Sequence, residues 1–306
     1  MTGAASVKQA EKLKTELINL LAKGGFELRK WCSNLPESLN SLPAQYLENP
    51  IVFSTEESAF KILGLMWEPN SDNFTYHTHQ FQGPSTKRTI LSYISQIFDP
   101  LGWLTPVVFW AKHFLQQLWL FQCDWDEPLN PILRHQWETF VAEIHLLQQI
   151  KIPRKFPNDY QQLRLIGFCD ASQKGFAACI YLCFLRDSSN YTILLKAKSK
   201  VAPLTPLSIP RLELSGALLL AKLFVSVRKS LSTFKIEETL LYTDAQIVLA
   251  WLQTMPHILK PFVANRVVKI IELTNPESWY YISSKENCAD AASRGMTPQQ
   301  LSTFPS

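Results

Sequence analysis

The 306-residue sequence is poor in glycine and contains no long apolar run. Its 10 glycines stand against 19 prolines, which excludes collagen-like repeats and Gly/Ser-rich linkers. The longest uncharged stretches contain proline and are shorter than the roughly 20 residues that a transmembrane helix needs. The N-terminus lacks the apolar core of a signal peptide, and no internal repeat indicates a solenoid. We therefore expect a globular, intracellular and cytoplasmic protein without a membrane partner.

Cysteine pairs with metal-binding spacing are absent as well. None of the six cysteines forms a C-x-x-C pair, and the closest two, Cys179 and Cys183, lie in an apolar, strand-like run. This spacing argues against a zinc site and a disulfide framework, so we predict reduced, buried thiols. Strong charge of either sign is also lacking. The net charge of +4 permits an anionic partner without requiring one.

The hydrophobic pattern divides the chain near residue 157, and the length of 306 residues suits two domains of about 150 residues each. Residues 1–156 are predicted to be a mostly helical α+β part, with helices at 6–22, 87–122 (broken near 99–102) and 132–149, and strands at 26–31, 59–67 and 73–77. Residues 157–306 are predicted to be α/β, with three antiparallel strands at 164–169, 176–184 and 191–201, a helix at 210–231, a strand at 239–243, helices at 245–252 and 261–273, a strand at 279–283 and a last helix at 287–294.

Four carboxylates fall at particular points of the second part. Asp170 and Asp244 each end a buried strand, and adjacent central strands would place them side by side. Glu213 is predicted in the first turn of the helix over the sheet, on one face with Ala217. Asp290 opens the last helix. An ionised acid at the end of a buried strand is costly unless it pairs or binds a cation.

Each acid taken alone has a structural explanation. Asp244 and Asp290 could be helix N-caps, and Asp170 could be a turn residue. Glu213 could complement a helix dipole. Together, however, four acids at one sheet edge would repel one another, and a divalent cation would remove that repulsion. Oxygen ligands without Cys or His favour Mg²⁺ or Mn²⁺, and two such ions would suit phosphodiester displacement.

These acids lie in sequences that resemble a known family. The stretches GFCDAS, RLEL, YTDAQIVLAWL and NCADAASRG resemble the four acidic motifs of a ribonuclease H (RNase H) domain in its retroelement form. LGLMW, KRTILSYISQIFDPLGWLTPV, DWDEPL, IPR and KPFVANRV resemble the Pol polyprotein of BEL/Pao retrotransposons. The matching segment runs from the reverse-transcriptase thumb and connection through RNase H and covers nearly the whole chain.

The resemblance implies a fold and an activity. Residues 1–156 would be a mostly helical thumb- and connection-like module, and residues 157–306 an RNase H-like domain with a mixed five-stranded sheet and flanking helices. Asp170, Glu213, Asp244 and Asp290 would be catalytic, hold two Mg²⁺ ions and hydrolyse the RNA strand of an RNA–DNA hybrid. The hybrid and the rest of the Pol polyprotein would be the partners, in the cytosol or in a virus-like particle.

Several family features are missing. No Y-x-D-D sequence is present, so the polymerase centre is not expected. The family is often labelled a Pao retrotransposon peptidase, but no D-[ST]-G motif supports peptidase activity. Many RNase H enzymes carry a histidine shortly before the last acid, whereas all six histidines here precede residue 258. We expect slower product release or another residue in that role.

Basic residues in the second part are candidates for contacts with nucleic-acid phosphates. Those singled out are Lys174, Lys196, Lys198, Lys200, Arg211, Lys260, Arg266 and Lys269. The three lysines from 196 to 200 alternate along one predicted strand and therefore share a face. A solvated charged face is the plain alternative, whereas phosphate contacts predict salt-sensitive binding. The tryptophans at 103, 110, 119, 125 and 137 have helical spacing and are expected in the core rather than stacked on bases.

Two rivals to an RNase H-type endoribonuclease remain. The chain could be a remnant that binds hybrid without cutting it, although its four intact acids favour activity. It could also be a DDE-type transposase or integrase core, which shares the fold class. The hairpin at Asp170, the helix-borne Glu213 and a last acid that is Asp rather than Glu argue against that reading.

Overall fold

The computed structural model describes residues 3–4, 6–48, 51–52, 58–62, 65–187 and 189–304. The chain forms two compact units. Unit 1 comprises Met1–His77 and Leu147–Phe156, and unit 2 comprises Thr78–Leu146 and Pro157–Ser306. The chain passes between units at the predicted boundary of 156 and 157, but residues 78–146 belong to the same unit as residues 157–306. The assignment of residues 1–156 to one thumb- and connection-like module stays a prediction.

Unit 1 contains one long helix and a small antiparallel sheet. Helix α1 (Val7–Ala22) begins at the predicted place, where the Ser6 hydroxyl accepts from the amide of Gln9. The short helices are η1 (Pro36–Leu39) and η2 (Ala44–Tyr46), and the strands in order across the sheet are β1 (Ile51–Val52), β2 (Ser58–Ile62), β3 (Leu65–Glu68), β4 (Asn73–Thr75) and β5 (Ile152–Pro153).

Two strand predictions in unit 1 were wrong. Residues 26–31 form no strand, because Lys30 has a φ of 60° that extended backbone does not allow, and only Trp31 makes an isolated bridge to Leu47. The single strand predicted at 59–67 is instead two strands, β2 and β3, which pair with each other. The turn predicted before β4 is confirmed, and Asp72 there has a positive φ of 53°.

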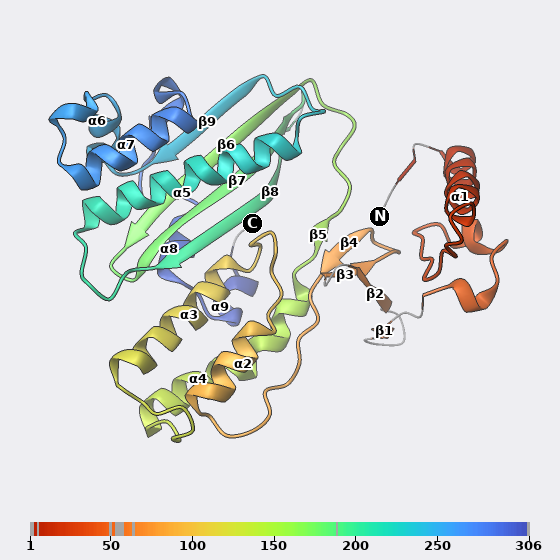
Figure 1. The fold of residues 1–306 in the computed structure, drawn as a ribbon, viewed down its shortest axis with the longest axis horizontal. Coiled ribbons are helices and arrows are strands. Elements are labelled where there is room, and N and C mark those ends of the chain that lie inside the picture. The colour runs from red at the N-terminus through yellow and green to blue at the C-terminus, as the bar shows by residue number, and fades with distance from the viewer. Residues whose placement is uncertain are drawn as a thin grey trace. The chain divides into compact units, whose positions relative to one another are not determined.

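Unit 2 contains the mixed five-stranded sheet that was predicted (Figure 1). Its strands are β6 (Gln162–Ser172), β7 (Gly175–Leu185), β8 (Tyr191–Val201), β9 (Glu238–Thr243) and β10 (Trp279–Tyr281), in the order β10-β9-β6-β7-β8. The first three run antiparallel, whereas β9 is parallel to β6 and β10 is parallel to β9. The fold class is therefore confirmed.

Helices lie on both faces of this sheet, and α5 and α8 make many of the contacts with its strands. The helices from residue 87 onward are α2 (Lys87–Ser95), α3 (Thr105–Leu120), α4 (Pro131–Glu143), η3 (Ile144–Gln149), α5 (Ile209–Ser230), α6 (Gln246–Leu252), η4 (Pro256–Ile258), α7 (Pro261–Leu273), η5 (Pro276–Ser278), α8 (Asp290–Arg294) and α9 (Pro298–Ser302). The predicted break between α2 and α3 is confirmed.

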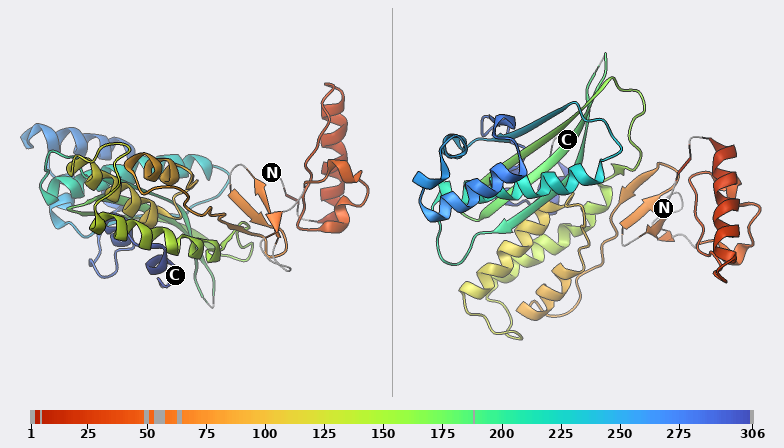
Figure 2. Two further views of the ribbon diagram at one scale, coloured as in Figure 1. Left: turned by 90° about the horizontal axis from the view of Figure 1, so that it is seen from below. Right: turned by 45° about the horizontal axis from the view of Figure 1, so that its top comes forward.

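Strand alternation shows which helix lies on which face. A side chain added at Gly167 of β6 would meet Leu220 of α5. The side chains of Asp170 and Ser172, on the opposite parity of the same strand, contact Ser293 of α8. Thus α5 and α8 lie on opposite faces, with α5 in front of the sheet and α8 behind it in Figure 1. Helix α7 packs beside α5, as the right view of Figure 2 shows.

The core of unit 2 includes part of the predicted tryptophan block. Trp137 is fully buried, and the ring of Trp110 stacks on Phe140 at 4.4 Å. Trp119 and Trp125 are 50% and 40% exposed and were wrongly expected in the core. Their rings hold the ammonium group of Lys87, which lies 3.6 Å from the Trp119 centroid.

The cysteines are free thiols, as predicted. Cys169, Cys179 and Cys183 are buried in strands β6 and β7, which agrees with the expected packing role. Cys288 is exposed, against the prediction. Among the described helices, none combines the length and the apolar character needed to cross a membrane.

Candidate active site

Two of the predicted acids lie side by side because their strands are neighbours. Cys169 of β6 pairs in parallel register with Thr243 of β9, and each is followed by an aspartate, Asp170 and Asp244. Parallel neighbours end at the same edge of the sheet, so both carboxylates lie at that edge. The Asp170 side chain is buried, at 3% exposure, and that of Asp244 is half-buried.

Glu213 reaches the same place from α5. The helix begins at Ile209, so Glu213 lies in its second turn rather than in the first, where it was predicted. A first-turn contact with the helix dipole therefore does not account for this acid. Glu213 is buried together with Ala217 and Leu220, which confirms the predicted helix face. The sheet-facing side of α5 thus places a carboxylate over the strand ends.

The three carboxylates form one cluster. Each of Asp170, Glu213 and Asp244 has an oxygen atom, and these oxygens all lie within 4.8 Å of one another. Helix capping explains neither Asp244 nor Asp290, because the N-cap of α6 is Ala245 and the N-cap of α8 is Ala289. The Asp244 carboxylate instead accepts a hydrogen bond from the hydroxyl of Ser284, at 2.6 Å.

Asp290, the fourth predicted acid, lies outside this cluster of three. It is the first residue of α8, and its carboxylate forms an ion pair with Arg294 one turn later, at 2.5 Å. Ser293 links it to the cluster, because the Ser293 hydroxyl donates to the carboxylate of Asp170 and lies 3.1 Å from the backbone oxygen of Asp290. The structure therefore brings three acids together and holds the fourth on the adjoining helix.

Burial and mutual repulsion raise the proton affinity of the cluster. Burial, above all, raises the pKa of Asp170 to about 6, with the charge of Asp244 adding to it and the hydrogen bond from Ser293 opposing it. Burial raises the pKa of Glu213 to about 8, and the charges of Asp170 and Asp244 act in the same direction.

The donor atoms of the cluster fit a divalent cation. Glu213 Oε2 and Asp244 Oδ1 are buried and have no hydrogen-bond partner among the described residues. Buried polar atoms without partners are rare, and a cation would satisfy both. The cluster offers carboxylate oxygens only, the ligands that Mg²⁺ and Mn²⁺ prefer, and no histidine belongs to it in the described chain.

Sequence reasoning missed Ser284, Ser293 and Arg294, which contact Asp244, Asp170 and Asp290. Ser293 and Arg294 follow Asp290 by three and four residues, the spacing at which helical side chains meet. That spacing was a readable signal. The contact of Ser284 joins residues 40 positions apart and had no local signal.

Two of the predicted basic residues converge on one aromatic ring. The guanidinium groups of Arg211 and Arg266 lie 5.0 and 3.5 Å from the ring centroid of Phe262. Burial, followed by the nearby charge of Arg211, lowers the pKa of Arg266. Among the described residues, neither arginine has a carboxylate within ion-pair distance. An anion would relieve their repulsion.

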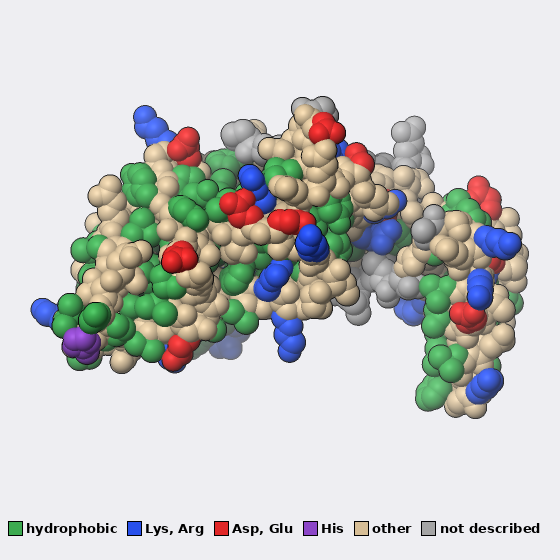
Figure 3. Space-filling model, turned by 90° about the horizontal axis from the view of Figure 1, so that it is seen from above, with side chains coloured by type: hydrophobic (Ala, Val, Ile, Leu, Met, Phe, Trp, Pro, Cys, Tyr) green, Lys and Arg blue, Asp and Glu red, His purple; other side chains and the backbone are tan. Residues whose placement is uncertain are grey.

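The remaining basic residues are distributed more widely. Lys196, Lys198 and Lys200 share one face of β8, with Ala197 and Ser199 buried between them. The ammonium group of Lys174 donates to the backbone oxygen of Arg294, at 3.3 Å. Lys260 and Lys269 are exposed at α7. On the face seen in Figure 3, basic and acidic side chains are interspersed. Roles in nucleic-acid binding stay predictions.

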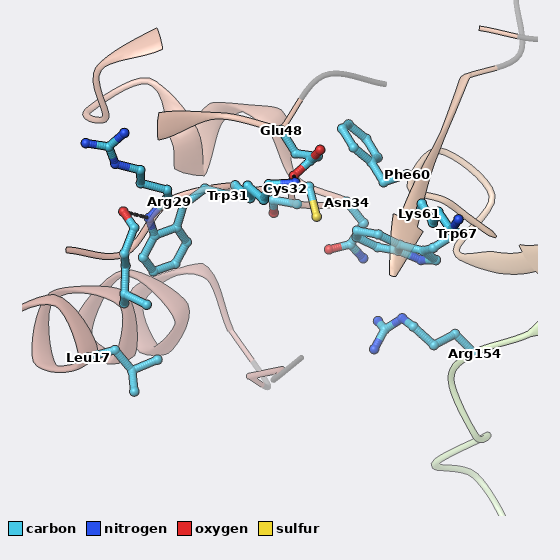
Figure 4. A pocket seen from close by; sticks show the side chains of 13 residues that line it. Leu17, Arg29, Trp31, Cys32, Asn34, Glu48, Phe60, Lys61, Trp67 and Arg154 are labelled. Carbon is cyan, nitrogen blue, oxygen red and sulfur yellow. Dashed lines mark hydrogen bonds and ion pairs between the residues drawn. The ribbon is translucent and has the colours of Figure 1, made fainter. Parts of the chain in front are cut away.

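Unit 1 contains a pocket of about 700 Å³ (Figure 4). Its wall includes Trp31, Phe60, Trp67 and Arg154. The Arg154 guanidinium is paired with Asp72 at 2.5 Å. None of the residues predicted for catalysis or nucleic-acid binding lines this pocket.

The fold and site define an α/β protein with a carboxylate cluster at the edge of a mixed sheet. The model of the family described as Pao retrotransposon-like RNaseH-like domain matches residues 86–245, just over half of the chain. The protein belongs to this family. The matched range includes Asp170, Glu213 and Asp244 and starts directly before α2.

Solved RNase H structures are similar to this chain at low identity. The N-terminal RNase H domain from Mycobacterium tuberculosis, solved as a fusion with maltose-binding protein, is 10% identical over 46% of this chain and 99% of that chain (TM-score 0.30). LC11-RNase H1 in complex with RNA/DNA hybrid is 12% identical over 46% and 99% (TM-score 0.31). The foamy viral protease–reverse transcriptase in complex with RNA/DNA hybrid is 10% identical over 62% and 28% (TM-score 0.25). Curated proteins give no match.

Replacing a cluster aspartate should not harm folding. Asp170→Asn or Asp244→Asn removes one repelling charge, so the metal-free variants should unfold at the same temperature as the wild type or higher. Thermal unfolding in EDTA measures this, with Glu272→Gln on the exposed side of α7 as the control. Unfolded Asn variants would contradict the proposed cluster.

The metal-free protein should lose stability as pH rises from about 4 to about 8. The ordinary pKa values of Asp170 and Glu213 are 3.8 and 4.5, whereas their pKa values in the folded protein are about 6 and about 8. Between these values the native state holds protons on the two acids that the unfolded state has lost. Folding is therefore disfavoured by rising pH through this window. Urea unfolding at several pH values checks the slope, which Glu213→Gln should flatten in its upper part. An unchanged slope in the variant would contradict the assignment.

Proposed function

We propose that this protein is an RNase H-type endoribonuclease that hydrolyses the RNA strand of RNA–DNA hybrids with the aid of two Mg²⁺ ions. One observation carries the proposal. Three carboxylates meet within 4.8 Å at the ends of adjacent strands, with two buried oxygens lacking partners, in a chain of the Pao RNaseH-like family. The order of the acids along the chain and the helix that carries Glu213 support the same reaction.

Asp170, Glu213 and Asp244 would hold the cations, with Mn²⁺ as an alternative to Mg²⁺. When bound, divalent cations stabilise the attacking and leaving oxygens of a phosphodiester displacement. The protein residues fix the positions of the ligands: Ser293 orients one carboxylate oxygen of Asp170, and Ser284 orients one of Asp244. Use of Asp290 as a further ligand requires its ion pair with Arg294 to open.

The substrate side of the proposal rests on the basic residues. Arg211 lies two positions before Glu213, and its guanidinium group and that of Arg266 both lie over the ring of Phe262. Among the described residues neither guanidinium forms an ion pair, although that of Arg266 donates to the backbone oxygen of Phe262. We assign this pair to phosphates of the hybrid. The lysines of β8, with Lys174, Lys260 and Lys269, would extend the contact. Recognition of 2′-hydroxyls in the minor groove would tell the RNA strand from the DNA strand.

A hybrid-binding remnant without activity is the second candidate. Two observations favour it: Asp290 is held by Arg294 outside the cluster, and the cluster of described residues contains no histidine. Polymerase and peptidase activities are not proposed. The proposed partners are the hybrid and the rest of a Pol polyprotein, and the proposed setting is the cytoplasm or a virus-like particle.

Cleavage of a labelled RNA–DNA hybrid in Mg²⁺ tests the activity directly. The wild type should cut the RNA strand, EDTA should stop cutting, and Asp244→Asn should lower the rate by about 100-fold or more because a ligand is lost. Hybrid binding without cutting would overturn the enzyme in favour of the remnant. If the Asp244→Asn variant cuts the RNA strand as fast as the wild type does, the activity would come from a contaminating nuclease.

The two arginines should contribute to the salt dependence of hybrid binding. Arg211→Ala and Arg266→Ala should each reduce the slope of log K against log salt by about 1. Arg228→Ala is a matched control, because Arg228 is exposed at the other end of α5. Binding measured in EDTA separates this effect from catalysis. If the slope of all three variants equals that of the wild type, Arg211 and Arg266 belong to a solvated face and do not contact phosphate.

A further inference from the structure

Helix α3, which precedes all four acids in the sequence, is attached to the sheet of unit 2 at both its ends. Residues 101–103, which precede α3, form hydrogen bonds with β8. Residues of α3 itself form hydrogen bonds with Ala202, directly after β8, and with Met296, two residues after α8. These are Ala197 N to Leu101 O (2.9 Å), Trp103 Nε1 to Leu194 O (2.9 Å), Gln116 Nε2 to Ala202 O (2.7 Å) and Met296 N to Pro106 O (3.1 Å). The contacts join positions about 90 to 190 residues apart in sequence, so they are tertiary.

Phe109 of α3 is the centre of this attachment. It is fully buried, and its ring lies against two glycines. A Cβ atom built on Gly175, which opens β7, would be 2.7 Å from Phe109 Cε2. A Cβ atom built on Gly295, which follows α8 with a φ of +81°, would be 3.1 Å from Phe109 Cδ1. Only glycine lets the ring approach both backbones this closely.

The two glycines flank the parts of the candidate site that must meet. Gly175 follows the turn of the hairpin that carries Asp170, and Gly295 ends the helix that carries Asp290 and Ser293. Helix α8 has five residues, too few to be stable alone, so its placement depends on packing. One buried ring therefore lies against both the start of β7 and the residue that follows α8.

We propose that Phe109 is a positioning residue: seated on Gly175 and Gly295, it holds α8 against the β6–β7 hairpin so that Ser293 and Asp290 face Asp170. The consequence for cleavage rests on the proposed nuclease function. It follows that the active unit includes α3 and does not begin at residue 157. The grouping of residues 78–146 with residues 157–306 agrees with this, as does the start of the family match at residue 86.

The test compares Phe109→Leu with Phe114→Leu in the full chain. Phe114 is a buried ring of the same helix, but it stacks on Trp110 and Trp137, and none of its atoms is among the three nearest to a Cβ at either glycine. Both substitutions remove a ring from the same core. Amide hydrogen exchange of Ala292, Ser293 and Gly295 reports the placement of α8 without any need for activity, and exchange in α5 reports global stability.

Phe109→Leu should speed exchange in α8 by roughly tenfold relative to α5, while Phe114→Leu should not. Its turnover on hybrid should fall about tenfold and its Mg²⁺ requirement should rise, with KM unchanged, because the ligands are misplaced and substrate contacts are intact. If Phe109→Leu does not fold, Phe109→Met replaces it, since methionine retains most of the volume.

The outcomes separate the two proposals. Selective exchange in α8 without cleavage by the wild type would uphold positioning and overturn the nuclease. If the wild type cleaves the hybrid, and both leucine variants exchange and turn over at the wild-type rates, the positioning role would be overturned and the nuclease would stand. Equal loss in both variants, in exchange as in turnover, would assign Phe109 to general core packing and also overturn the proposal.

Discussion

The structure of unit 2 depends on the electrostatic cost of its carboxylate cluster. Two of the three acids are buried, and the oxygens of all three lie within 4.8 Å. Two like charges at about 4 Å repel by about 4 kcal/mol at an effective dielectric constant of about 20. The metal-free protein meets this cost by holding protons on Asp170 and Glu213 well above their ordinary pKa values. A divalent cation would meet the same cost with the carboxylates ionised, so the cluster that destabilises the metal-free fold is also suited to bind a cation.

Several elements of unit 2 together build this arrangement. The parallel pair β6 and β9 supplies two acids at one sheet edge, and α5 supplies the third from one face. Helix α8 closes the site from the opposite face through Ser293. Because α8 is short, the sheet needs a second covering element there, and α3 provides it. Residues 78–146, which include α3, thus belong to the same compact unit as the site.

Much of this could be predicted from the sequence because its signals are local. Apolar runs ending in Asp170 and Asp244 predicted buried strands with acids at their ends, and the helical face shared by Glu213 and Ala217 predicted which way that acid points. The resemblance of the motifs implied a mixed five-stranded sheet, without the order of its strands. Lys30 shows where local signals fail: its positive φ interrupts a run that otherwise has strand composition.

What could not be predicted is carried by contacts between distant residues. The packing of Phe109 on Gly175 and Gly295 spans up to 186 positions and leaves no periodic trace. The helical pattern of α3 revealed that it has a buried side but not which sheet buries it. The ion pair of Asp290 with Arg294 was local, yet nothing in the sequence decided between that pairing and a shared cation site.

The most direct test of the central claim is to locate a bound cation. Crystals of the full chain grown with Mn²⁺ would give an anomalous signal at each manganese site. The account predicts a peak contacted by the carboxylates of Asp170, Glu213 and Asp244, and its loss in crystals of Glu213→Gln. Manganese bound elsewhere, or no manganese at this sheet edge in a folded protein, would contradict the assignment of the cluster as a divalent-cation site.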